Sequence, residues 1–534
     1  MKLVSKTTLF LSFVLCAALV VSAPATAQTV TTGVLSGSVV DSQGGVLPGA
    51  TVVAVHRPTG TTYEGVVAAD GRFTLLNVQA GGPYTVTVTM SGFRANEQAN
   101  LIVNLGEERS LVFKLDLSSV SETVTVTAET PAIDTLRAGA GGNISSDIKE
   151  SLPTISRSLT DVVRTNPYFS AIATNNGVAG ISVAGRNERY NSIQIDGAVN
   201  NDLFGLANTG TPGGQTETQP VSLDAIAQIQ LVVSPYDVRQ GGFSGGGINA
   251  ITKSGTNQLS GTAFYFGRNQ SWVGDGISKT PISNFSDKQL GFSVGGRLVE
   301  NKAFFFANAD WGRKLTPTGF CITGCAQEFR GTTADVDRFF SILQSKYNYT
   351  VPGAKDEFSR TTDSNKFLGK IDVNLSNNSR LTLRHNYVKG LNDIAFPSET
   401  GYITPDGGYR FRSTTNGTVA QLNSTFGSAV NELRVAYTRV RDRRGAQPTE
   451  TTPFPRVTVR LPSSLQITVG RENFSTANEL DQNIIEIHDD FTWLKGSHTI
   501  TVGTHNEFFD FRNLFIRDNF GTYTFNSLDK FDQG

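Results

Sequence analysis

The sequence has few charged residues, few cysteines and no surplus of charge of either sign. Charged residues make up 17% of the 534 residues, against about 25% in an average soluble domain. The 46 basic and 47 acidic residues leave a net charge of −1, so the basic surplus that accompanies nucleic-acid binding is missing. Three cysteines are too few for a disulfide scaffold. We therefore expect no nucleic-acid partner and a fold that rests on packing.

Long hydrophobic runs are also scarce, and the one at the start predicts export. Lys2 and Lys6 precede an apolar run over Leu9–Val21, and small residues follow as far as Ala27. This order predicts a secretory signal peptide over residues 1–27, cleaved after Ala27, because the run is shorter than the roughly 20 residues of a spanning helix. No later stretch is apolar enough for a helical span, so the exported protein either stays soluble or enters a membrane as a β-barrel.

What the chain does have is glycine, phenylalanine and alternation. Its 54 Gly and 34 Phe favour a mainly β protein. In residues 28–117 the apolar side chains of Tyr84, Val86, Val88 and Met90 alternate with threonines, which predicts a strand with one buried face. Asp70-Gly71 predicts a hairpin turn. We expect a β-sandwich here.

The order of motifs in this segment is more specific than its composition. The motifs are Val40-Asp41, Leu47-Pro48-Gly49-Ala50, Asp70-Gly71-Arg72-Phe73, Gly82-Pro83-Tyr84 and Gly92-Phe93. In this order they resemble the carboxypeptidase regulatory-like domain, and the resemblance covers nearly the whole segment. It implies a β-sandwich similar to carbohydrate-binding folds.

Residues 118–131 form a linker that contains one short strand-like piece. Alone, this piece could be a last strand of the sandwich. It also resembles the TonB box of outer-membrane receptors, formed here by Glu122, Thr123, Val124, Thr125, Val126, Thr127 and Ala128. The segment is short of apolar residues and ends in Pro131, so we expect the box to be mobile or loosely held.

Residues 132–260 mix helix and strand. Leu152, Ile155, Leu159 and Val162 recur at helical spacing, with Ser156 as a candidate N-cap. Short strands and a glycine-rich stretch follow. The succession resembles the plug domain of TonB-dependent receptors, although Ser234 stands where the family usually has glycine, and residues 235–242 resemble the Oar-like branch. The positions that match the plug motif are Arg186, Asp196, Gly197, Pro235, Gly241, Gly246, Gly247, Asn249, Thr252 and Lys253.

Residues 261–534 show long alternating segments. Leu381 and Leu383, Val435, and Ile500 alternate with polar residues, as in outer-membrane barrel strands, although soluble sandwiches alternate too. A plugged barrel has about 22 strands, and we find about half that number of candidates. We therefore expect an incomplete barrel in a truncated chain. Aromatic residues near segment ends are candidates for interface girdles or for core: Phe264, Tyr265, Phe266, Trp311 and Trp493.

The sequence offers little chemistry. The histidines lack the spacings of zinc peptidases. Gly242-Phe243-Ser244-Gly245-Gly246 formally matches a nucleophile motif, which needs a strand–turn–helix context. Cys321 and Cys325 could form a loop disulfide in an oxidising compartment. We expect no catalytic residue, metal or cofactor.

Together the motifs resemble a TonB-dependent, Oar-like outer-membrane receptor. The fold expected is an N-terminal β-sandwich, an α+β plug and part of a transmembrane barrel. The resemblance implies active uptake of an extracellular siderophore, oligosaccharide or peptide. The partners would be TonB with its energising complex and outer-membrane lipid, and the N-terminal domain would lie in the periplasm. Two alternatives stay open: a surface adhesion or matrix protein on the same barrel, and an exported carbohydrate-binding protein.

Overall fold

The computed structural model describes most of the chain after the first thirty residues. The described residues are 31–117, 124–127, 141–154, 156–172, 180–207, 209–233, 237–274, 282–325, 327–351, 353, 355–448, 452–496 and 498–534. The predicted signal peptide, Pro235, and Glu122, Thr123 and Ala128 of the predicted box lie outside them. In the described part, no helix is both long enough and apolar enough to cross a bilayer.

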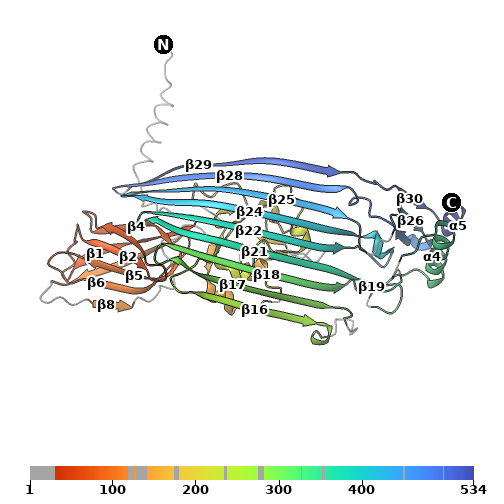
Figure 1. Ribbon diagram of the computed structural model, residues 1–534, viewed down its shortest axis with the longest axis horizontal. Coiled ribbons are helices and arrows are strands. Elements are labelled where there is room, and N and C mark those ends of the chain that lie inside the picture. Colours follow the sequence, from red (N-terminus) through yellow and green to blue (C-terminus); the bar gives the residue numbers. More distant parts are fainter. Residues whose placement is uncertain are drawn as a thin grey trace, which may run out of the picture.

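The N-terminal residues form a sandwich of two sheets, at the left of Figure 1. One sheet has the order β4-β1-β7 and the other β3-β2-β5-β6-β8. Tyr84, Val86 and Val88 of β5 are fully buried, as their alternation predicts. The strands are β1 (Thr32–Asp41), β2 (Thr51–His56), β3 (Thr61–Val66), β4 (Arg72–Gln79), β5 (Gly81–Thr89), β6 (Asn96–Val103), β7 (Glu108–Leu115) and β8 (Val124–Thr127).

The hairpin predicted at Asp70-Gly71 is wrong. The turn itself exists, with Gly71 at a φ of 80° and its N–H donating to the carbonyl of Ala68. However, β4 pairs with β1 rather than with β3. The turn is a corner that carries the chain from one sheet to the other.

The second unit is a small five-stranded sheet with short helices, which we call the plug after the domain expected for this segment. The sheet order is β13-β12-β15-β14-β9, and a separate hairpin joins β10 to β11. In Figure 1 these yellow elements lie behind the long strands. The elements are β9 (Gly141–Ile144), α2 (Ser146–Ser151), α3 (Leu159–Val163), β10 (Phe169–Ile172), β11 (Gly180–Val183), η1 (Glu188–Tyr190), β12 (Ser192–Ile195), β13 (Ala198–Val199), η2 (Gly214–Thr216), η3 (Leu223–Ala225), β14 (Ile226–Val232) and β15 (Gly247–Thr252).

The helical period read across Leu152–Val163 covers two elements, not one helix. Pro153 follows the end of α2, and a new helix begins after Ser158, whose side chain and that of Asp161 form a capping box. Ser156 is therefore not the N-cap. Its hydroxyl instead donates to the Asp161 carboxylate at 2.8 Å. The reason is physical: proline cannot continue a helix, so the chain must restart with a new cap.

Nine long strands form one antiparallel sheet in sequence order, with β16 and β29 at its edges in the described residues. They curve around the plug (Figure 1). The strands are β16 (Ser260–Asn269), β17 (Ser286–Val299), β18 (Ala303–Pro317), β21 (Ser359–Ser376), β22 (Ser379–Ile394), β24 (Tyr409–Phe426), β25 (Ala429–Gly445), β28 (Asn478–Lys495) and β29 (His498–Phe515). The segments predicted around Leu383, Val435 and Ile500 are β22, β25 and β29.

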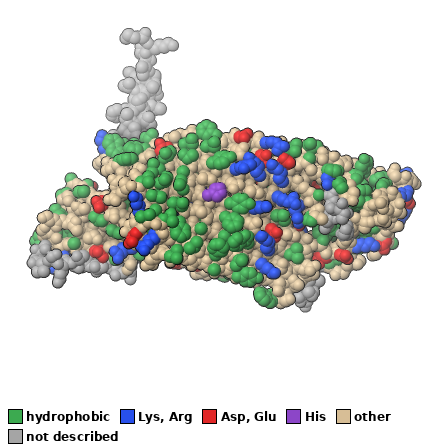
Figure 2. Space-filling view, viewed as in Figure 1, with side chains coloured by type: hydrophobic (Ala, Val, Ile, Leu, Met, Phe, Trp, Pro, Cys, Tyr) green, Lys and Arg blue, Asp and Glu red, His purple; other side chains and the backbone are tan. Residues whose placement is uncertain are grey.

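The outer face of this sheet is apolar and its inner face is polar. Leu383 and Val435 are exposed, while Arg384 and Arg434, their chain neighbours, are buried. Figure 2 shows the hydrophobic side chains as a broad band across the long strands, with Lys and Arg gathered on one side of it. A polar interior with an apolar outer band is the arrangement of transmembrane barrels.

The aromatic residues proposed as girdles divide between the two faces. Tyr265 and Trp493 are exposed, and Trp311 packs on the outer face against Phe292 and Phe367. Phe264 and Phe266 instead face the plug, where the Arg157 guanidinium lies 4.6 Å and 4.2 Å from their ring centroids. Of the two alternatives, girdle or core, the girdle does not apply to these two residues.

The two ends of the sheet differ in their connections. Next to the sandwich, β17–β18, β21–β22, β24–β25 and β28–β29 are joined by two or three residues; we call this the short-turn end. At the opposite, long-loop end, the connections pack into a cap around a core of its own that includes Phe339, Tyr402 and Val459. The elements of the cap are β19 (Phe320–Cys321), β20 (Gln327–Glu328), α4 (Thr333–Tyr347), β23 (Gly401–Ile403), η5 (Pro405–Gly407), β26 (Arg456–Arg460), η6 (Pro462–Ser464), β27 (Gln466–Val469), β30 (Thr522–Phe525) and α5 (Leu528–Gln533). One further turn, η4 (Gln270–Trp272), follows β16.

Candidate functional site where the plug meets the barrel wall

Four of the predicted plug-motif residues meet at one buried turn. Asp196 and Gly197 follow β12 with φ angles of 50° and 75°, a conformation that glycine adopts freely and aspartate tolerates. The Asp196 carboxylate accepts hydrogen bonds from the backbone N–H and the hydroxyl of Thr252, both at 2.8 Å. Asn249 accepts from the Gly197 N–H at 3.1 Å. The turn is thus tied to β15, the parallel neighbour of β12.

Two cations of the barrel wall face this turn. Lys370 of β21 lies 3.8 Å from Asp196 Oδ1 and donates to the Thr252 carbonyl at 3.2 Å. Arg384 of β22 lies 3.4 Å from Asp196 Oδ2. All three side chains are buried. Removing one member of such a group leaves an uncompensated buried charge, so the group holds plug and wall in one arrangement.

Further polar contacts surround the plug. Ser222 donates to Asp310 of β18 at 2.7 Å, and Lys366 binds the other oxygen of that carboxylate at 3.1 Å. Asn386 donates to the Pro220 carbonyl at 2.9 Å. The wall also makes apolar contacts with the plug: Phe306 and Leu368 join the plug core cluster, and Val419 and Ala436 pack against Ala198. The contacts between plug and wall are thus mostly hydrogen bonds and ion pairs.

The remaining plug-motif residues do not join this group. Arg186 and Gly241 are exposed on loops. Gly246 packs so closely on β11 that a Cβ there would lie 2.4 Å from Val183 Cγ1, and Gly247 begins β15. Lys253 lies 3.7 Å from Asp224 and 3.9 Å from Glu150 within the plug.

A polar cavity of about 230 Å³ lies at the short-turn end, between the sandwich, the plug and the wall. Asp196 and Lys370 line it from one side and His56 from the other. Arg380 crosses the gap: it pairs with Asp372 at 2.9 Å and donates to Gln79 of the sandwich. Burial and the nearby Arg380 charge lower the pKa of His56 to about 3. The sandwich is thus packed against the mouth of the barrel.

The predicted box contains a strand at the edge of the sandwich. Val124–Thr127 form β8, which pairs in parallel with residues 96–99 of β6. In backbone terms this matches the alternative in which the piece is the last strand of the sandwich. In the described residues β8 ends the sheet, so its outer edge is available for another strand.

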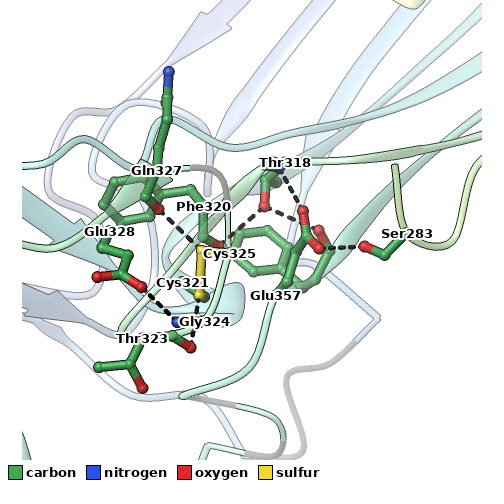
Figure 3. The surroundings of a disulfide bond; sticks show 12 residues. Ser283, Thr318, Phe320, Cys321, Thr323, Gly324, Cys325, Gln327, Glu328 and Glu357 are labelled. Atoms are coloured by element: carbon green, nitrogen blue, oxygen red, sulfur yellow. Dashed lines mark hydrogen bonds between the residues drawn. A yellow bond between two sulfur atoms is a disulfide. The ribbon is translucent and has the colours of Figure 1, made fainter. Parts of the chain in front are cut away.

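A disulfide joins Cys321 and Cys325 at the base of the cap, where their Cα atoms are 6.0 Å apart. Figure 3 shows Glu357 nearby, with the Ser283 hydroxyl donating to it. The Glu357 carboxylate also accepts from the Gly319 N–H at 2.8 Å. Glu328 accepts from the Gly324 N–H at 2.6 Å. The bridge and these two carboxylates fix the connection that leaves β18.

The formal nucleophile motif has no catalytic context in the structure. Ser244 is exposed on a loop that leads into strand β15 rather than into a helix, whereas a nucleophile elbow requires a strand–turn–helix arrangement.

The wall side of the interface is not readable from local sequence patterns. Lys370 and Arg384 lie far from Asp196 in the chain, and no local pattern links them. A usable signal existed on β28, where Glu486, His488 and Asp490 recur at every second residue and therefore share one face.

Two family models match the chain. Residues 34–116 match the carboxypeptidase regulatory-like domain. Residues 251–338 and 342–533 match the outer membrane beta barrel domain. The two matches confirm the regulatory-like sandwich and the outer-membrane barrel that the sequence motifs predict.

Among characterised proteins, the TonB-dependent transporter Oar of Myxococcus xanthus is 21% identical over 408 residues, which are 73% of this chain and 35% of the relative. The chain thus spans about a third of the length of that curated relative. Similar solved structures include the outer membrane transporter YddB from Escherichia coli, 14% identical, with a TM-score of 0.48 over 70% of this chain and 48% of that one. The ferripyoverdine receptor of Pseudomonas aeruginosa is 13% identical, with a TM-score of 0.44 over 75% and 48%.

Proposed function

Since the chain belongs to the outer membrane beta barrel domain family, we propose that it works as a TonB-dependent receptor that actively takes up an extracellular ligand. The family places the chain in the outer membrane, where short turns face the periplasm and long loops face outward. The sandwich, the plug and β8 would then lie on the side from which TonB approaches. The similarity to the Oar transporter supports the same proposal.

The observation that carries this proposal is the polar seam between plug and wall. A plug held by an apolar core would have to lose its whole buried area before it moved. Asp196 with Lys370, and Ser222 with Asp310, instead make polar contacts that water can substitute as the plug moves. A pulling force could therefore displace the plug without unfolding the barrel.

The force would enter through β8. The outer membrane has no ATP, so energy has to come from the inner membrane through TonB. A strand at a sheet edge can be captured by addition to another sheet. For β8 this means either pairing at its free edge or leaving β6 to pair with TonB.

The test uses Val124→Pro in the full-length protein and the purified periplasmic domain of TonB. Proline lacks the N–H donor and obstructs strand pairing. We expect binding of the TonB domain, measured by fluorescence anisotropy, to weaken at least about tenfold. Thr125→Ser keeps every backbone donor and is expected to bind like the parent.

Domain stability is measured on the same variant, because β8 also pairs with β6. Unchanged TonB binding by Val124→Pro would overturn the box assignment. A lowered melting temperature of the sandwich with normal TonB binding would assign β8 a purely structural role.

The cap supports a second candidate, a surface adhesion protein. Its separate core, with Phe339 and Phe531 stacked at 5.3 Å, makes it a folded unit at the outward end that could present a binding surface. Normal surface attachment by a TonB-deficient strain, lost on deletion of this protein, would favour adhesion over uptake.

A further inference from the structure

Three side chains with metal-binding atoms converge on the lumen face of β28 and β29. They are Glu486, His488 and His505, and one potential ligand atom from each lies within 4.8 Å of the other two. His488 and His505 are directly opposite each other in the ladder, with ring centroids 5.2 Å apart. Glu486 and His488 are buried, while His505 is a third exposed.

Each buried residue of this cluster uses one polar atom for a partner outside the cluster. His488 Nε2 contacts the Asp490 carboxylate, and its buried Nδ1 has no hydrogen-bond partner among the described residues. A carboxylate on one ring nitrogen is the usual way in which a histidine is oriented toward a metal with the other. Glu486 Oε2 accepts from the Val199 N–H of the plug at 3.0 Å. Its Oε1 is buried and makes no hydrogen bond of ordinary geometry to any described residue.

The third residue completes a set of donors with excess negative charge around it. His505 Nε2 lies 3.3 Å from Glu486 Oε1 and 3.3 Å from Glu507 Oε1. Arg434 lies 3.9 Å from Glu486 Oε1. It also pairs with Glu432 at 2.9 Å, so its single positive charge is shared between two carboxylates.

We propose that Glu486, His488 and His505 form a site for a divalent transition-metal cation of the Zn²⁺ type. Two imidazoles and a carboxylate are a donor set that zinc accepts, with water or Glu507 in the fourth position. Tetrahedral bonds of about 2.0–2.2 Å place donors roughly 3.3 Å apart. To reach that spacing, the donors must move closer together than the 4.8 Å within which they lie in the structure, and the partly exposed His505 side chain has space to rotate.

The bound ion would cross-link β28 and β29 on the lumen side. Through Glu486, which also holds the plug at Val199, metal occupancy would be coupled to the position of the plug. The site does not depend on TonB-driven uptake, since an adhesion protein on the same barrel would carry it too.

The test uses Zn²⁺ alone on the full-length protein in detergent, after removal of metal with a chelator. We expect one tightly bound equivalent by calorimetry and elemental analysis, and a visible absorption band of tetrahedral Co²⁺ when cobalt replaces zinc. No bound zinc, or a cobalt spectrum without a tetrahedral band, would overturn the proposal.

Variants locate the ion. His505→Gln and His488→Gln are expected to remove the bound equivalent, and Asp490→Asn to weaken binding about 10- to 100-fold. The matched control is His498→Gln, an exposed histidine on the same strand β29, which should bind zinc like the parent.

Heat-modifiable migration in gels checks that each variant folds. If the histidine variants do not fold, the cobalt spectrum of the unaltered protein decides. Equal zinc binding by folded His505→Gln overturns the proposal.

Discussion

The sandwich and the barrel sheet use the same two-residue alternation in opposite directions. In β5, Val86 and Val88 point into an apolar core. In β25, Val435 and Tyr437 point outward, and Glu432 and Arg434 are buried inside. Alternation therefore fixes which residues share a face, whereas the surrounding medium decides whether the apolar face lies inside or outside.

Strand length separates the two cases where alternation does not. Strand β5 has 9 residues, and the sandwich needs only enough length to cover its core. Strand β21 has 18, which exceeds the 9–11 residues that a tilted strand needs to cross a bilayer. Long alternating strands with charged residues on their buried face thus indicate a membrane barrel.

The largest effect expected is that of a charge placed in the sandwich core. Val86→Asp buries a carboxylate with no partner, which should destabilise the sandwich by about 4 kcal/mol or more. In the full-length protein, limited proteolysis should then cut within residues 31–117, while the barrel stays heat-modifiable in gels. A sandwich that resists protease in this variant would contradict the apolar-inside arrangement.

In the barrel interior, removing a buried charge should destabilise the contact between plug and wall. Asp196→Asn removes the anion that faces buried Lys370 and Arg384, and we expect a loss of about 3 kcal/mol. Hydrogen exchange should accelerate in β12 and β15. The control, Asp147→Asn, changes an exposed carboxylate in the first turn of α2 and should cost only a few tenths of a kcal/mol. Equal exchange in the two variants would show that the seam does not hold the plug.

The sequence anticipated what depends on local order and missed what depends on distant pairing. The β5 alternation was readable because its cause lies within a few residues. Asp70-Gly71 misled, because the same turn serves a hairpin or a corner and the choice is made by β1, some thirty residues earlier. Lys370 and Arg384 could not be foreseen, since only the folded sheet brings them to the plug.

A cation placed on the outer face of the barrel sheet tests whether that face meets lipid. Val435 is exposed near the middle of β25, so Val435→Arg should cost about 2 kcal/mol in a bilayer. Unfolding in lipid vesicles measures the loss, and Val435→Leu is the apolar control. The same arginine on a water-facing surface would be nearly neutral, so an unchanged stability would show that this face does not meet lipid.

The smallest effect expected is a pH dependence at the contact of the two regions. His56 is buried beside Arg380, its Nδ1 lies 2.7 Å from the Thr59 hydroxyl, and its pKa is lowered from 6.5 to about 3. In the unfolded chain the imidazole gains its proton near pH 6.5, whereas in the folded protein it stays neutral down to about pH 3. The stability that this histidine contributes is therefore present above pH 6.5 and is lost progressively as the pH falls toward 3. Between about pH 7 and about pH 5.5 the loss should be about 1 kcal/mol, measured by urea unfolding of the full-length protein.

His56→Gln should remove this part of the pH dependence of the free energy of unfolding, and His498→Gln, which changes an exposed histidine, should keep it. Equal slopes in the parent and His56→Gln would mean that the buried imidazole does not stay neutral against the barrel mouth.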